Sequence, residues 1–516
     1  MKSKTDTLHK KEPEVNDKSI DSLTKEVAKG GGITFIGRLA TRIIGLIFNI
    51  IMARVLGPGS YGVYLLAATV TSICQSLSSV GFRLGVVRYV SIYEGEQNRP
   101  FLKGAIISGL LLSVSVSAIL AFCLFLFSGY LGKNIFSEPD LTWVLKIFAY
   151  SLPFNAIIGI AGSVARAFRK IAYRTFLEDL FHPVTNVMFV SIAFLIGYSL
   201  RGAIYGIIFS AMISAVLGAL IILKVCPDLL KSPYPVYKNK KMLKYSLPLF
   251  LAGITSLLLT RTDHIMLGIF GVSEDVGIYG VAAKMAFLLT FFVGSFNIVF
   301  GPQIADLYNR GDLSNLRALF QIVTKWIFTL TFPMFLVFVI FSRDIICIFG
   351  NNFTSGWKTL ITLSAAKLIT TSMGSLALIL IMTGRQKLEF VNSIIVAVIN
   401  VILNLALIPH YGKMGAAMAA SFSLIIIAVI RLLEVKLLYK MHPFGLSFIK
   451  PLVAGLLCSV LLLGTKSLVP AFRFDWIIGI AYFVGIYLGI YLFLGIEKED
   501  RVVISAIKKK SGWFKV

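Results

Sequence analysis

Apolar runs of about twenty residues recur along almost the whole of this 516-residue chain. Each run is long enough for a helix to cross the hydrocarbon core of a bilayer, which is about 30 Å thick. Most runs are apolar on all sides, whereas a surface helix of a soluble protein carries a polar face at helical period. Only 15% of the residues are charged, against about a quarter in soluble domains. The sequence therefore predicts an all-α polytopic membrane protein with about fourteen transmembrane helices.

One segment of the sequence returns in a looser copy. Residues 30–64 combine an apolar run that contains two arginines, a Gly-Pro-Gly turn and the start of a second run, and residues 245–282 follow the same order. Later runs correspond as well, for example residues 185–215 and 399–424. This repetition predicts two six-helix bundles of the same orientation, a transporter architecture in which the substrate path lies between the bundles.

The repeat and the composition of the remaining segments predict six parts. The first 26 residues are polar and mixed in charge, which is typical of a disordered tail. The longest loop lies between the two repeats and is rich in Lys, Pro and Tyr, as expected for a linker. In chain order the parts are a disordered cytoplasmic tail (1–26), an N-terminal six-helix bundle (27–223), a cytoplasmic linker (224–245), a C-terminal six-helix bundle (246–440), two additional transmembrane helices (441–496) and a basic cytoplasmic tail (497–516).

The chain is strongly basic, with 50 Lys and Arg against 25 Asp and Glu. In a soluble protein such an excess would indicate nucleic acid as a partner. Here the cations gather at both termini and in the loops on the same side of the predicted helices, which is the positive-inside pattern. The charge therefore predicts a multi-pass protein of the plasma (inner) membrane with both termini in the cytoplasm and no nucleic-acid partner.

Five cations lie deep inside predicted helices. Exposed to lipid, each would cost about 2.5–3.5 kcal/mol, so they are expected to face a hydrated cavity. Because acids at that depth are scarce, the cavity should be electropositive and should take an anion; arginine in particular offers paired donors that match phosphate oxygens. The alternative is that these cations hold helices together through carbonyl groups and Asp263. The predicted substrate-binding residues are Arg38, Arg42, Arg261, Lys284 and Lys367.

Asp263 is the one clear acid deep in a predicted helix. It is expected to pair with a residue of the first predicted helix (31–52) or the eighth (277–298), or to serve as a site for a coupling proton or sodium ion. Two further cations, Lys146 and Arg431, lie closer to helix ends, and their long side chains are expected to reach the lipid headgroups.

Motifs of enzymes and of metal or nucleotide sites are absent from the sequence. There is no GxxxxGK[ST], HExxH or GxSxG, and five cysteines are scattered singly without a Cys/His cluster. A membrane glycosyltransferase or ligase would need a large outer loop with acids or histidines, and the predicted loops are short. The sequence therefore predicts a transporter that is not an enzyme and that uses no cofactor and no metal.

Three segments carry a resemblance to a known family. They are GRLATRIIGLIFNIIMARVLGPGSYGVY (37–64), IYGVAAKMAFLL (278–289) and LNLALIPHYGKMGAAMAAS (403–421). Together they resemble Wzx-type flippases, the polysaccharide-transport branch of the multidrug/oligosaccharidyl-lipid/polysaccharide exporter superfamily. The similarity extends over nearly all of the predicted membrane region.

The resemblance implies two six-helix bundles that form a V around a central cavity, with two further helices. It implies a flippase that moves an oligosaccharide, joined through diphosphate to a polyprenol, from the cytoplasmic to the outer leaflet, alongside membrane lipids and a glycan polymerase or transferase machinery. The family's cationic cavity residues correspond to Arg38 and Arg42, and to Arg261 and Lys284; Lys367 rests on its charge alone. Two alternatives remain: a cation-coupled multidrug antiporter of the same fold, and a flippase for a lipid-linked peptidoglycan precursor.

Overall fold

The computed structural model describes residues 17–79, 81–227, 229, 234–237, 239–445, 448–468 and 476–495. Within these ranges every regular element is a helix and none is a strand. Among the described helices, six are long and apolar enough to cross a membrane, or up to eight if each of two bent helix pairs forms one span. The prediction of an all-α polytopic membrane protein is therefore confirmed, whereas the number of fourteen helices stays a prediction.

Two helices are much longer than a bilayer is thick, because each contains two apolar runs. Helix α1 (Asp17–Ser79) has 63 residues and helix α17 (Gln386–Tyr439) has 54. Each is divided by a glycine with a positive φ, Gly57 at 71° and Gly412 at 52°. Only glycine adopts this conformation without steric cost, so the Gly-Pro-Gly turn of the sequence becomes the turn between the two arms of α1.

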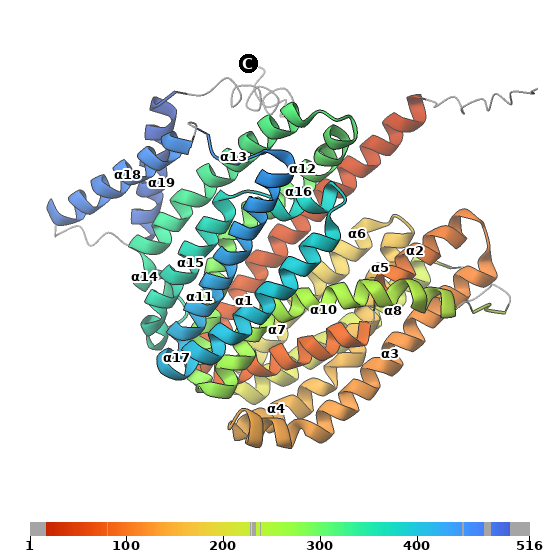
Figure 1. The fold of residues 1–516 in the computed structure, drawn as a ribbon. Helices are drawn as coiled ribbons and strands as arrows, with labels where there is room; N and C mark the ends of the chain where they lie inside the picture. The colour runs from red at the N-terminus through yellow and green to blue at the C-terminus, as the bar shows by residue number, and fades with distance from the viewer. Residues whose placement is uncertain are drawn as a thin grey trace, which may run out of the picture.

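The helices fall into two groups that α1 and α11 (Ser273–Phe287) connect. Helices α2 to α8 pack with one another and form the N-terminal group, whereas α12 to α17 form the C-terminal group (Figure 1). Each group has a buried apolar cluster of its own, and a larger cluster runs through both. Helices α18 and α19 pack beside α13. The bounds are α2 (Phe82–Gly95), α3 (Arg99–Tyr130), α4 (Pro139–Ala149), α5 (Ser151–Ala167), α6 (Ile171–Arg174), α7 (His182–Leu195), α8 (Leu200–Val225), α10 (Asn239–Phe270), α12 (Phe291–Asn309), α13 (Leu313–Ile340), α14 (Ser342–Cys347), α15 (Trp357–Ser372), α16 (Leu376–Met382), α18 (Ile449–Leu468) and α19 (Trp476–Phe493).

One bent helix pair lies in each predicted repeat. Helices α4 and α5 meet at 44°, and the segment that contains α15 meets α16 at 43°. The two bends fall on the fourth predicted helix of each repeat, residues 141–163 and 357–381, and the duplication itself stays a prediction. The predicted domain boundaries themselves stay predictions: residues 17–26 of the predicted N-terminal tail lie in α1, and the remainder of that tail and the whole C-terminal tail lie outside the described residues.

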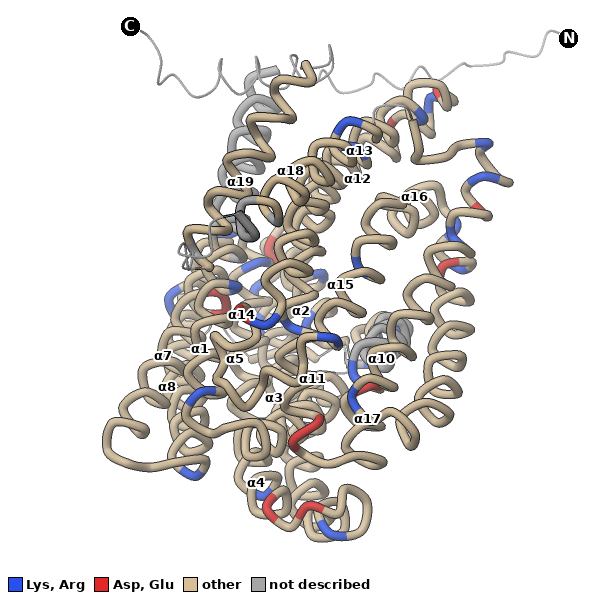
Figure 2. Tube along the Cα trace, turned by 90° about the vertical axis from the view of Figure 1, so that its left-hand side faces the viewer, with Lys and Arg blue, Asp and Glu red and all other residues tan. Residues whose placement is uncertain are grey.

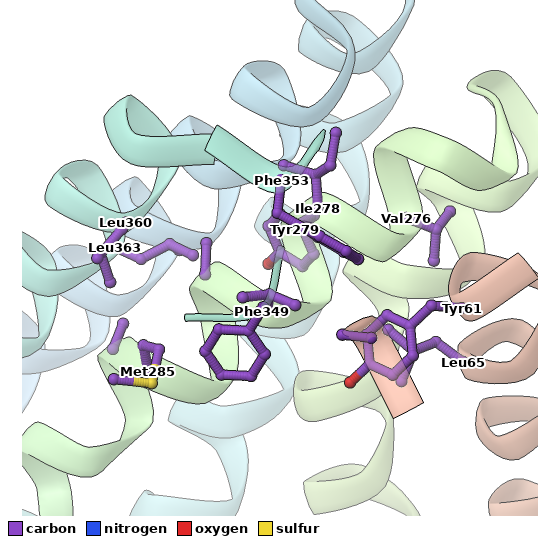
Figure 3. Packing of buried hydrophobic residues seen from close by; sticks show 14 of the residues in the cluster. Tyr61, Leu65, Val276, Ile278, Tyr279, Met285, Phe349, Phe353, Leu360 and Leu363 are labelled. Carbon is purple, nitrogen blue, oxygen red and sulfur yellow. The ribbon is translucent and has the colours of Figure 1, made fainter. Parts of the chain in front are cut away.

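Helices α1 and α11 touch most closely just after the Gly57 turn. A Cβ atom on Gly62 would lie 1.7 Å from the carbonyl oxygen of Ser273, and one on Gly277 would lie 2.1 Å from that of Pro58. Tyr61, on the same arm of α1, lies beside α11 in the buried cluster that Figure 3 shows. The absence of side chains at the two glycines therefore lets the two backbones pack directly against each other.

Candidate functional site

A single aromatic ring, Phe287 at the end of α11, lies beside cations from two different helices. The guanidinium carbon of Arg42, on α1, is 5.6 Å from the centroid of this ring, and the Lys367 Nζ, on α15, is 6.0 Å from it. The two cationic groups can therefore be at most 11.6 Å apart, the sum of these two distances. Arg42 also lies over the ring of Phe291, at 4.9 Å. The structure thus brings together two of the five predicted substrate-binding cations.

Lys284 takes part in a different arrangement, which ties α11 to α1. Its Nζ donates a hydrogen bond to the hydroxyl oxygen of Tyr61 at 2.8 Å and another to Oδ1 of Asn49. The Tyr61 hydroxyl in turn donates to Asn49 Oδ1 at 2.8 Å. The lysine is therefore held by two polar groups of α1, which corresponds to the alternative that an embedded cation joins helices.

Arg261 lies on α10, half-buried, near the Lys284 group. It interacts electrostatically with Tyr64, with His264 and with Lys284. In the part of the chain that the structure describes, Arg261, Lys284 and Lys367 form no salt bridge with a carboxylate. Excess positive charge therefore remains between α1, α10, α11 and α15. Figure 2 shows Lys and Arg midway along the bundle as well as at helix ends.

Asp263 is buried and bound by three neutral donors. The Tyr279 hydroxyl donates to its Oδ2 at 3.0 Å, and the side-chain amides of Asn400 and Asn404 donate to its Oδ1 at 3.0 and 2.9 Å. Tyr279 belongs to the predicted eighth helix, in agreement with the expected pairing. Asn400 and Asn404 were not foreseen, although two asparagines four residues apart in an apolar run are a recognisable signal of a polar helix face.

The remaining predicted cations have other outcomes. Arg38 lies on α1, but its side chain is outside the described ones, so its role stays a prediction. Arg431 is expected to reach the headgroups. Its Nε donates to Glu389 at 2.9 Å, and its Nη2 binds the second oxygen of the same carboxylate. Both residues lie on α17, one on each arm, and the turn at Gly412 brings them together; the reach to the headgroups stays a prediction.

The described residues contain no group of three His, Cys, Asp or Glu side chains that could hold a metal ion. Besides Asn400 and Asn404, the sequence did not single out the polar side chains of Asn49 and Tyr61 or the aromatic rings of Phe287 and Phe291. Asn49 and Tyr61 occur within the repeated segment 30–64, but nothing in the sequence identifies Lys284 as their partner. Phenylalanines are so frequent in this chain that these two rings give no signal of their own.

Known proteins resemble the chain over most of its length. It is 24% identical to a protein of Haloferax volcanii named a probable low-salt glycan biosynthesis flippase, over 88% of this chain and 91% of that protein. A second protein of the same organism, named a probable flippase, is 22% identical over 77% of this chain and 81% of its own length.

Solved structures share the fold. A lipid II flippase in an inward closed conformation superimposes with a TM-score of 0.72 at 18% identity, covering 89% of this chain and 98% of that structure. An inward-facing multidrug resistance transporter of the MATE family gives 0.64 at 14% identity, covering 79% and 98%. A family model described as polysaccharide biosynthesis protein matches residues 27–308, more than half of the sequence. The chain therefore belongs to the polysaccharide biosynthesis protein family, as its sequence motifs indicate.

Proposed function

We propose that the protein is a flippase that moves a polyprenyl-diphosphate-linked oligosaccharide from the cytoplasmic to the outer leaflet of the plasma membrane. One observation carries this proposal: Arg42 and Lys367, from two different helices, lie against the same ring inside an apolar bundle. Two such charges are costly in lipid and are favoured beside an anion in a hydrated cavity. The diphosphate of a lipid-linked oligosaccharide is an anion, and its lipid tail keeps it in the membrane, where it can meet cations that lie deep in the helix bundle.

The division of the cations into two arrangements supports distinct roles. The groups that bind the diphosphate are Arg42 and Lys367, and Arg261 and Arg38 are further cations proposed for the same cavity. Lys284 holds α11 to α1 through Tyr61 and Asn49, and it reaches the substrate only after these hydrogen bonds break. The names of two relatives support the proposal, since one is called a probable low-salt glycan biosynthesis flippase and the other a probable flippase.

The transport mechanism is alternating access. The contact between Gly62 and the Ser273 carbonyl, together with a 2.6 Å hydrogen bond from Arg54 Nε to the Ile348 carbonyl, holds the N-terminal arms to the C-terminal group at one end. With both termini in the cytoplasm, this end faces the outside, so the site is reached from the cytoplasm. For release to the outer leaflet, the backbones of α1 and α11 separate at Gly62 and Gly277, and the hydrogen bonds of Lys284 break.

Asp263 is the site for a coupling ion or proton. Three neutral donors hold the carboxylate without cancelling its charge. No donor among the described residues reaches Oδ1 of Asn404, a buried oxygen in the same cluster. Carboxylate and amide oxygens are ligands that hard cations prefer. The energy comes from an ion gradient or the membrane potential, because the sequence holds no P-loop.

The proposed organisation follows the repeat: two six-helix bundles, 27–223 and 246–440, with the two added helices 441–496 and cytoplasmic tails. Partners are the lipid-linked oligosaccharide, the surrounding lipids and a polymerase or transferase that uses the flipped product. A peptidoglycan precursor shares the diphosphate, so the same site serves it. A multidrug antiporter is the weaker alternative, because cationic drugs need acids where this site has cations.

Reconstitution into proteoliposomes tests the function. Purified wild-type protein is combined with a polyprenyl-diphosphate oligosaccharide, and its leaflet is scored by a sugar-oxidising reagent that does not cross the bilayer. Parallel vesicles hold a cationic dye. We expect protein-dependent movement of the lipid and none of the dye. If the protein exports the dye and moves no lipid under any of the imposed gradients, it is a multidrug antiporter and the proposed function is wrong.

A further inference from the structure

We propose that Phe287 is a positioning residue whose ring holds Arg42 and Lys367 as the two sides of one diphosphate site. This inference rests on the proposed function for the class of ligand. It adds a residue that carries no charge and lies outside the predicted set. It also explains how two cations on different helices are placed at one site.

Phe287 occupies the point where three helices meet. It is the last residue of α11, directly before the 3-10 turn η3 (Leu288–Thr290) that leads into α12. Helix α11 packs against both α1 and α15, so a ring at its end can contact Arg42 and Lys367 together. The ring is 53% exposed although it lies in the interior of an apolar span. Since two cations within about 6 Å are incompatible with lipid around it, its exposed side faces a hydrated space.

The ring gives each cation a preferred position that an aliphatic side chain would not. A cation over an aromatic face is attracted by the ring quadrupole, and the attraction grows when the pair is shielded from water. Lys367 has a competing partner, because Asp263 attracts it electrostatically. Without the ring, Lys367 would move towards Asp263, and the site would lose one of its two charges. Phe287 therefore keeps the anion site and the Asp263 cluster separate.

The geometry also selects the ligand. Arginine forms paired hydrogen bonds to phosphate oxygens, whereas lysine acts as a mobile point charge. Because both cationic groups lie within 6.0 Å of the same ring centroid, and so at most 11.6 Å apart, each can bind one phosphate of a diphosphate. A monophosphate can neutralise only one of them closely. The site therefore prefers pyrophosphate to phosphate.

The test measures binding of inorganic pyrophosphate to the full chain in lipid nanodiscs by calorimetry, with inorganic phosphate for comparison. For Phe287→Leu we expect about tenfold weaker pyrophosphate binding, because two cation–π contacts are lost. Phe287→Trp should bind within about twofold of wild type, since indole is the strongest aromatic partner for a cation. Replacing Phe287 by progressively fluorinated phenylalanines keeps the shape of the ring and should weaken binding step by step.

The outcomes separate this inference from the proposed function. Wild-type-like binding in Phe287→Leu and in the fluorinated series would overturn the role of Phe287 and leave the cationic site intact. Equal losses in Phe287→Leu and Phe287→Trp, with no trend on fluorination, would show that the residue acts only by packing. If the wild type binds no pyrophosphate, the anionic substrate class fails, and the role of Phe287 fails with it.

Discussion

Lys284 Nζ lies 2.8 Å from the hydroxyl oxygen of Tyr61, and this hydrogen bond joins α11 to α1 across the interface between the two predicted repeats. The lysine also lies over the Tyr61 ring, at 5.2 Å from its centroid. A cation that the sequence assigns to substrate is therefore engaged in holding two helices together. Because the contact joins the partly buried Lys284 of α11 to the buried Tyr61 of α1, it must break before the two helices can separate.

The Tyr61→Phe variant tests this contact. The variant loses the hydroxyl oxygen that accepts a hydrogen bond from the charged amine of Lys284. This loss should lower the free energy of unfolding by about 1–2 kcal/mol. It should also raise the labelling rate of a cysteine at buried Val276, next to Tyr61 in Figure 3, by a reagent applied from outside. The five native cysteines are replaced first. Tyr279→Phe is the matched control: it loses a hydrogen bond to Asp263 but leaves the α1–α11 contact alone. Equal labelling in all three proteins would contradict a role for Lys284 in closure.

A second prediction concerns the glycine contact at the same interface. In Gly62→Leu the new side chain has no room, because even a Cβ would lie 1.7 Å from the Ser273 carbonyl. Overpacking of this kind costs about 1–3 kcal/mol, enough to move the population towards a form with α1 and α11 apart. Labelling at Val276→Cys should rise and lipid movement should slow. Gly59→Ala, whose Cβ meets nothing within 4 Å, should behave as wild type. Unchanged labelling in Gly62→Leu would argue against closure at this contact.

Asp263→Asn removes the charge of the buried acid and keeps its shape. The amide oxygen can still accept hydrogen bonds from Asn400 and Asn404, so the protein should fold. We expect the stimulation of lipid movement by an imposed sodium or proton gradient to fall by about tenfold. The measurement compares proteoliposomes with and without each gradient. Full stimulation in the variant would exclude Asp263 as the coupling site.

The pH dependence of stability has an identifiable source at the start of α13. Asp312 accepts hydrogen bonds from the backbone and side chain of Asn315 and from Ser314, which lowers the pKa of this carboxyl below its ordinary value of 3.8. A lowered pKa in the folded state stabilises the protein above pH 3.8, and this stabilisation is lost as the pH falls through the folded value.

The expected result is a pH-dependent difference between wild type and Asp312→Ala. The unfolding temperature of the variant should lie below that of wild type at pH 7, and the difference should shrink as the pH falls below 3.8. Asp306→Ala serves as a control, since its exposed pair with Arg310 contributes little. A constant difference at all pH values would show that the carboxylate charge is irrelevant to the cap.

The sequence predicts those structural features that depend on one segment of the chain at a time. Apolar runs predict the helices, and the Gly-Pro-Gly turn predicts the break in α1 at Gly57. Arg42 and Lys367 can be identified as candidates from the sequence alone. A charged side chain inside an apolar run is costly in lipid, however the helix packs against its neighbours. These features require only hydropathy and local backbone preferences.

Contacts between distant segments could not be predicted in this way. Lys284 and Tyr61 are separated by 223 positions, and Asp263 and Asn404 by 141. Which polar groups meet is decided by how α1, α10, α11 and α17 pack, and a single sequence does not specify that. The same reason applies to Arg431, whose pair with Glu389 joins the two arms of α17 and could not be predicted from either segment alone.

The most direct test of the central claim is lipid movement by variants that lose one cation of the Phe287 pair. Arg42→Gln and Lys367→Gln are compared with Arg343→Gln and Lys358→Gln, which remove exposed cations that lie over Trp357 instead. Loss of a charged hydrogen-bond donor to phosphate should slow movement of the diphosphate-linked oligosaccharide by about ten- to a hundredfold in the first two variants. The two controls should match wild type. Wild-type rates in folded Arg42→Gln and Lys367→Gln would contradict the account.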